Sequence, residues 1–280
     1  GDGYQLAYQL AAGTTSVLLT VVGLILLFRL LGMYGTPMIS ALTVLAITFT
    51  TNLWFYGSLD TVNSHGLSFF AACLYLSLIF AKNKQYGAIG AVLALIGLIR
   101  VQDLVYGILL IPYLRKSTII SITRGFSLFF LPQLLAWQLL YGKFWVSPYL
   151  SGGEGFFQVK PHVLEVLFSI QNGLITWTPI FAIGFVGLWL NKTISKSYQA
   201  LFIILILLQL MIVANWSTWW QGASYSGRMF VSLLPIFAFG LAEIFVRLQK
   251  FHWSVLYYLL CIIGPLAIIN MLLVIFFLLH

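Results

Sequence analysis

Long apolar runs separated by short polar turns make up most of the 280-residue chain. A helix needs about 20 residues to cross a hydrocarbon core about 30 Å thick, and most of the runs approach that length. The pattern therefore predicts nine or ten membrane-spanning helices. We place them at about 10–31, 37–56, 66–81, 87–99, 104–114, 119–140, 173–190, 198–215, 228–246 and 254–279.

The two runs at 87–99 and 104–114 are shorter than the others. They are consistent with two tilted spans, or with a re-entrant pair that turns at 100–103. Proline and glycine inside several runs do not argue against helices, because membrane helices tolerate both residues.

Composition supports the same fold class. Hydrophobic residues make up 61% of the chain and charged residues only 7%, whereas a soluble domain carries about 25% charged residues. We predict a single all-α domain over residues 1–280, a polytopic bundle whose main partner is the lipid bilayer. The net charge of +8 is spread along the chain without a basic stripe, so no nucleic-acid partner is expected.

Lysine and arginine in the short connections predict the orientation, because cytoplasmic loops carry an excess of both. Alternating the ten spans places ten basic residues on one side: Arg29, Lys82, Lys84, Arg115, Lys116, Arg124, Lys192, Lys196, Arg247 and Lys250. The other side receives four: Arg100, Lys143, Lys160 and Arg228. The first side is predicted to be cytoplasmic, in what we expect to be the plasma (inner) membrane.

Acidic residues gather on the opposite side. Asp2, Asp60, Asp103, Glu154 and Glu165 all fall at predicted outer ends or in outer loops, and Glu243 alone lies near the inside. A solvated outer surface explains part of this asymmetry. The other explanation is a working face outside the cytoplasm.

The first candidate stretch is the turn at 57–66, which carries Asp60 and His65. These two side chains suit acid–base, metal or substrate contacts. The alternative is a simple helix start, because Asn63 or Ser64 would cap a helix that begins near Gly66.

The second stretch holds Arg100, Gln102 and Asp103 between apolar residues. Ionisable groups at membrane depth are costly and usually pair or line a cavity. Arg100 and Asp103 are three residues apart and could pair on one helical face. Alternatively Arg100 binds a phosphate, to which its planar guanidinium is suited, and Gln102 orients it.

The third stretch is the polar loop at 142–171, with Gly152, Gly153 and Gly155 beside Glu154, and with His162 further along. Long loops without secondary structure are often functional, so a mobile segment over a site is expected. Residues 163–170 are predicted to form a short interfacial helix.

The fourth stretch, 215–228, interleaves Trp216, Trp219 and Trp220 with amides, hydroxyls and Arg228. Tryptophan favours the membrane interface, but that preference does not explain the polar residues between. Aromatic faces beside amides and hydroxyls suit sugar rings, and Arg228 is well placed for a lipid phosphate.

Residues 219–228 (WWQGASYSGR), followed by Leu234 and Pro235, resemble the late outer loop of GT-C membrane glycosyltransferases. Residues 172–179 (NGLITWTP), 64–70 (SHGLSFF) and 97–100 (GLIR) are also similar to recurring segments of that superfamily, in its protein mannosyltransferase and aminoarabinose transferase-like branch. The resemblance covers most of residues 50–240.

The resemblance implies an enzyme that moves a sugar from a polyprenyl-phosphate-linked donor to a glycan, lipid or protein acceptor outside the cytoplasm. In such enzymes an acidic residue of the first outer loop is the general base. No such loop is found here, so we expect the base upstream of Gly1 and assign this role to neither Asp2 nor Asp60. No cofactor is expected; a divalent metal is possible but not indicated by the sequence.

The predicted substrate-binding residues come from all four stretches. They are Asp60, His65, Arg100, Gln102, Asp103, His162, Trp219, Trp220, Gln221, Tyr225 and Arg228. Alternatives are a transporter or flippase, and a polysaccharide polymerase or ligase that uses lipid-linked sugars. A transporter would favour ionisable groups at mid-membrane and matching broken helices in two halves, and neither is evident.

Overall fold

The computed structural model describes residues 5–146, 153–156, 160–251 and 254–279, and every regular element in these ranges is a helix. The prediction of an all-α fold is confirmed for this part of the chain. The α-helices are α1 (Leu6–Leu30), α2 (Pro37–Phe49), α3 (His65–Phe80), α4 (Tyr86–Ile99), α5 (Lys116–Tyr141), α7 (Val163–Phe168), α8 (Leu174–Trp177), α9 (Ile180–Leu190), α10 (Lys196–Ala214), α11 (Leu234–Gln249), α12 (Val255–Tyr258) and α13 (Gly264–Leu279).

Shorter 3₁₀ and π segments connect or extend these helices. The 3₁₀ segments are η1 (Leu31–Tyr34), η3 (Val101–Tyr113) and η4 (Arg228–Leu233), and the π segments are η2 (Phe55–Leu59) and η5 (Leu259–Ile263). The predicted interfacial helix at 163–170 corresponds to α7.

Within the described ranges, five helical segments are long and apolar enough to cross a membrane. They are Leu6–Tyr34, Lys116–Tyr141, Lys196–Ala214, Arg228–Gln249 and Val255–Leu279, and their ends agree with five predicted spans to within a few residues. The other five predicted spans contain apolar helices of 10–17 residues. A helix of that length extends about 15–26 Å, less than the thickness of a hydrocarbon core.

The predicted span at 173–190 is interrupted, because α8 ends at Trp177 and α9 begins at Ile180. Pro179 lacks an N–H group and disfavours the helical conformation in the residue before it. Thr178 accordingly leaves the helical region, with φ −139° and ψ 68°. This break places the Thr178 hydroxyl 2.9 Å from that of Ser226.

Residues 86–113 form two adjacent helices, α4 and η3, that are joined at Arg100. The backbone of Arg100 is extended (φ −152°, ψ 112°), and this residue separates the two helices. The turn therefore lies at the predicted position, and it places the Arg100 side chain at the end of the helix pair.

α11 is the most enclosed of the five long segments, and α9 packs closely against it. A Cβ atom added to Gly240 of α11 would lie 1.8 Å from the carbonyl oxygen of Gly184. A Cβ on Gly187 would lie 2.0 Å from the carbonyl oxygen of Gly240. Only glycine permits the two backbones to approach this closely.

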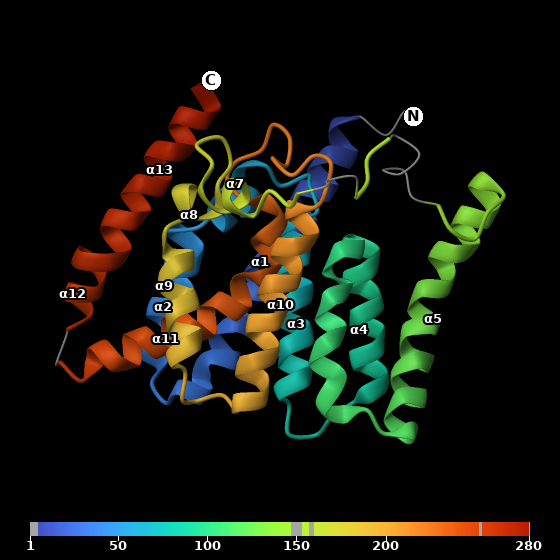
Figure 1. Ribbon diagram of the computed structural model, residues 1–280, viewed down its shortest axis with the longest axis horizontal. Helices are drawn as coiled ribbons and strands as arrows, with labels where there is room; N and C mark the ends of the chain where they lie inside the picture. Colours follow the sequence, from blue (N-terminus) through green and yellow to red (C-terminus); the bar gives the residue numbers. More distant parts are fainter. Residues whose placement is uncertain (1–4, 147–152, 157–159, 252–253, 280) are drawn as a thin grey trace.

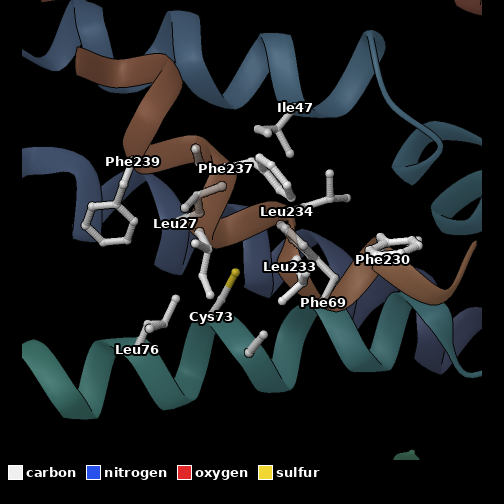
Figure 2. Close-up of a cluster of buried hydrophobic side chains, with 14 of the residues drawn as sticks. Leu27, Ile47, Phe69, Cys73, Leu76, Phe230, Leu233, Leu234, Phe237 and Phe239 are labelled. Atoms are coloured by element: carbon white, nitrogen blue, oxygen red, sulfur yellow. The ribbon is translucent and has the colours of Figure 1, made fainter. Parts of the chain in front are cut away.

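The core surrounds the start of α11. Figure 2 shows Phe230, Leu233 and Leu234 of the η4–α11 segment beside Phe69 of α3 and Ile47 of α2. The burial of these large apolar side chains fixes η4, and with it the residue that begins η4, Arg228.

α5 packs mainly on α4 and lies at the edge of the molecule (Figure 1). The contact depends on Gly90 and Gly125, because a Cβ on either would lie 2.0 Å or less from a carbonyl oxygen of the facing helix. The rest of α5 exposes large apolar side chains, including Leu128 and Phe129.

The two ends of the bundle differ (Figure 1). The turn at 60–64, the turn between α4 and η3, residues 160–171 and the 215–227 loop lie at the loop-rich end. The connections at 81–85 and 191–195 and the end of α11 lie at the opposite, basic end. The four stretches singled out in the sequence thus meet at one end of the fold.

Candidate functional site

Arg100 and His65 form the centre of the candidate site. Nη1 of Arg100 lies 2.6 Å from Nδ1 of His65, and the His65 ring is buried at the start of α3. A guanidinium can only donate hydrogen bonds, so Nδ1 must be the acceptor. His65 is therefore neutral, with its ring proton on Nε2. Two predicted site residues, 35 positions apart, are brought together here.

Arg100 has further contacts around it. Its Nη2 donates to Oε1 of Gln102 at 3.4 Å, and the same atom contacts the sulfur of Met229. The predicted orienting contact from Gln102 is therefore present. The side chain of Arg100 is partly buried and points from the α4–η3 turn towards η4.

Arg100 and Asp103 do not form the ion pair that their spacing allowed. The extended backbone at Arg100 interrupts the helix, so the two side chains do not share a helical face. Asp103 is 2% exposed and accepts hydrogen bonds from Ser232 Oγ at 2.9 Å and from Gln209 Nε2 at 3.3 Å. Asp103 therefore joins η3 to η4 and α10 inside the protein.

Arg228 is the second guanidinium of the site. It interacts electrostatically with His65 and Tyr56, whose rings are 4.5 Å apart between centroids. Its Nε is buried and has no hydrogen-bond partner among the described residues. A Cβ on Gly222 would lie 3.4 Å from Nη2 of Arg228, so the absence of a side chain there leaves room for the guanidinium.

The loop that presents Arg228 has a strained backbone. Gln221, Gly222 and Ser226 have φ angles of 64°, 69° and 56°. Residues other than glycine rarely adopt positive φ, and such residues cluster at functional sites. Gln221 is 2% exposed, and its Oε1 accepts a hydrogen bond from the backbone N–H of Met229 at 2.9 Å.

Tyr225 lies inside the protein and anchors this loop. It is fully buried, and its hydroxyl donates to Asn270 of α13. Burial, together with the nearby Tyr56 hydroxyl, raises the pKa of Tyr225 above its ordinary value, so the hydroxyl keeps the proton that it donates. The predicted role of Tyr225 in contacting a substrate is thus replaced by a supporting one.

Aromatic side chains flank the site. His162 stacks on Trp219, with centroids 4.7 Å apart and an interplanar angle of 18°. Trp220 lies edge-on to Trp219 and is 37% exposed. His162 also lies 3.6 Å from the carboxylate of Glu165. The structure therefore joins the third and fourth predicted stretches through His162.

A second contact between these two stretches involves Glu154. Its Oε2 accepts hydrogen bonds from Nε1 of Trp216 at 2.9 Å and from the hydroxyl of Thr218 at 3.2 Å. The predicted mobile segment includes Pro148 and Gly152, which, like Asp2, lie outside the described residues.

Asp60 differs from the other predicted residues because it is exposed. Its carboxylate forms no hydrogen bond or ion pair with the described residues, and its backbone carbonyl accepts from the Asn63 amide at 2.6 Å. Oδ1 of Asn63 in turn accepts from the backbone N–H of His65 at 3.0 Å. The N-cap of α3 is Ser64, whose side chain forms no capping bond, so Asn63 supports the turn just before the helix and is not its cap.

A cavity of about 330 Å³ lies behind the loop that presents Arg228. It is lined by residues 170–172 and 222–224, by Trp177, and by Phe276 and Phe277 of α13. The hydroxyl of Ser224 is buried without a hydrogen-bond partner among the described residues. Aromatic rings and amides thus line a space that borders Gly222, the residue next to which the Arg228 guanidinium lies.

Several contributors were not foreseen from the sequence. Gln209, Met229, Ser232 and Asn270 hold the functional side chains in place. Gln209 and Asn270 are single polar residues in apolar runs, and such residues are costly in a membrane unless they have a role. Met229 acts through its backbone and through the contact of its sulfur with Arg100, and the sequence carries no signal for either.

Among the described residues, no group of three or more His, Cys, Asp and Glu side chains could hold a metal ion. Comparison with protein family models, with curated proteins and with solved structures finds no match to this chain.

Proposed function

We propose that this protein spans the membrane several times, with its loop-rich end outside the cytoplasm. The apolar surface of helices such as α5 and α13 supports the first part, because large side chains there would face lipid. The basic residues at the other end support the second part, since cytoplasmic loops carry an excess of lysine and arginine. A plasma or inner membrane is the proposed location.

We further propose that the protein is a glycosyltransferase that uses a polyprenyl-phosphate-linked sugar. The observation that carries this proposal is the contact of Arg100 with the buried His65 at 2.6 Å and with the side chain of Met229, the residue that directly follows Arg228. Two guanidiniums at the loop-rich end suit the phosphate of a lipid carrier, because arginine binds phosphate oxygens through paired N–H groups.

The neighbouring aromatic residues suit the sugar. Trp219 and Trp220 present ring faces and edges near the site, and Asn172 lies between them and the cavity. A pyranose ring has an apolar C–H face for stacking and hydroxyls for amide hydrogen bonds. This combination favours a sugar phosphate over a phospholipid headgroup without a sugar.

The proposed reaction replaces one bond at the anomeric carbon with another. An acceptor oxygen attacks this carbon, the bond to the phosphate oxygen breaks, and the phosphate leaves with the electron pair while the acceptor's proton passes to a base. Arg100 and Arg228 stabilise the negative charge on the leaving phosphate. Donors placed where charge develops commonly contribute factors of about 10²–10³ in rate.

The test uses the full-length protein in membranes and a radiolabelled polyprenyl-phosphate sugar. Arg228→Gln should reduce the release of label from the lipid by at least about 100-fold. The control is Arg29→Gln, which removes an exposed arginine at the basic end and should leave release unchanged. Full release by Arg228→Gln would refute the assignment. Label that crosses the membrane while still on the lipid would instead indicate a flippase.

A further inference from the structure

Three glutamines from separate segments bind the backbone of one residue, Met229. Nε2 of Gln102 and Nε2 of Gln209 donate to the Met229 carbonyl at 3.3 and 3.0 Å. The Met229 N–H donates to Oε1 of Gln221 at 2.9 Å. We call this arrangement the Met229 clamp.

The clamp lies between the two guanidiniums of the site. Met229 directly follows Arg228 in the chain, and its sulfur contacts Arg100. Gln102 bonds both Met229 and Arg100. The backbone of Met229 therefore connects the residue that carries one guanidinium with contacts of the other.

Burial makes the clamp rigid. Gln209 is fully buried and Gln221 is 2% exposed, so water cannot easily replace their hydrogen bonds. Gln209 is itself held by Asp103, which Ser232 also binds. The clamp is thus tied to η3 and η4 by a second set of bonds.

The strained loop supplies a reason for such a clamp. Gln221 and Ser226 have positive φ angles, and a backbone of this kind persists only where its surroundings over-determine it. Without the clamp, the loop at 221–227 could relax and carry Arg228 away from His65.

We propose that Gln102, Gln209 and Gln221 are positioning residues that hold Arg228 at the distance from Arg100 at which both guanidiniums meet one phosphate group. The inference rests on the proposed function for its ligand, an isoprenyl phosphate. The buried glutamine amides would thus set the position of the guanidiniums that stabilise the charge on the phosphate.

The test compares two glutamines of the same helix. Gln209→Leu removes one of the three amides of the clamp. Gln199→Leu removes a buried amide that donates two hydrogen bonds, to the carbonyls of Leu188 and Trp189 at 2.6 Å, near the other end of α10. Each variant of the full-length protein is placed in nanodiscs, and binding of decaprenyl phosphate is measured. Gln209→Leu should bind about tenfold more weakly, because small misplacements of binding groups are costly, and Gln199→Leu should bind as the wild type does.

A double substitution separates positioning from general destabilisation. If Gln209 acts through Arg228, Gln209→Leu should cause no further loss of binding in an Arg228→Gln background. Equal losses in the Gln199→Leu and Gln209→Leu variants, or additive losses in the double variant, would overturn the proposal.

Amide hydrogen exchange tests the clamp without any ligand. Exchange in a peptide covering residues 222–233 should be faster in Gln209→Leu than in Gln199→Leu. If the wild type binds no decaprenyl phosphate, faster exchange supports the clamp and the proposed function alone fails. Unchanged exchange overturns the clamp whatever the binding result.

Discussion

The basic end and the loop-rich end each contain a polar cluster, and the two clusters differ in how completely their groups are paired. At the basic end, Nδ2 of Asn191 donates to the Tyr34 hydroxyl and the Phe239 carbonyl, and its Oδ1 accepts from the N–H groups of Thr193 and Ile194. Both N–H groups and both oxygen lone pairs of this amide therefore have protein partners.

The one carboxylate assigned to the basic end is also paired. Glu243 is buried, and its two oxygens accept from Nε of Arg247 at 2.9 Å and from the backbone N–H of Lys192 at 3.2 Å. At the loop-rich end, Arg228 forms no ion pair with any described carboxylate, and its buried Nε is unsatisfied within those residues. We call the cluster around Asn191 and Glu243 the closed cluster, because its polar groups are paired, and the cluster around Arg228 the open cluster. The closed cluster stabilises the fold, whereas the open cluster is suited to a ligand.

The largest expected effect tests the closed cluster. Asn191→Leu should lower the free energy of unfolding by about 3 kcal/mol or more, because several buried groups lose their partners and each costs about 1–3 kcal/mol. Thermal unfolding in detergent measures the loss. The control, Asn215→Leu, removes one exposed bond to the Met211 carbonyl and should change little. Equal stability of the two variants would show that the hydrogen bonds of Asn191 do not stabilise the fold.

A smaller effect, on activity, tests the open cluster. His65→Phe keeps a flat ring but removes the acceptor of the Arg100 hydrogen bond, so sugar transfer should fall about tenfold through misplacement of the guanidinium. His65→Asn places an amide oxygen near the position of Nδ1 and should retain most activity. The measurement is the initial rate of label release. Equal rates for the two variants would exclude an acceptor role for His65.

The smallest effect concerns Asp60. Its carboxylate is exposed and makes no bond to the described residues, so Asp60→Asn should change transfer less than twofold and stability by less than about 0.5 kcal/mol, as is usual for surface substitutions. Kinetic and thermal assays of the purified protein measure both. A tenfold loss of transfer would extend the site to Asp60, as the sequence predicted.

The sequence was sufficient for the helices, because long apolar runs leave few alternatives. It was less informative about where helices are interrupted. The helix breaks at Thr178 because Pro179 follows it, which the sequence shows. The hydrogen bond between Thr178 and Ser226 is a tertiary contact, which the sequence does not show.

The site was predictable only in part. Arg100, His65 and Arg228 were identified because ionisable groups are rare in such a chain. Their convergence depends on contacts over 35 and more residues, which no local pattern encodes. The interior positions of Asp103 and Tyr225 were missed for the same reason, since burial is decided by helices that are distant in sequence.

The link between Tyr225 and Asn270 has a consequence for biogenesis. Asn270 also donates to the carbonyls of Phe49 and Thr51, more than 200 residues earlier. Contacts between neighbouring helices such as α4 and α5 can form soon after synthesis, whereas contacts of high sequence separation form late. The loop that carries Arg228 therefore gains its contacts with Asn270 only when α13 inserts. A nascent chain that stops before α13 would have assembled most of its helices without acquiring a finished site.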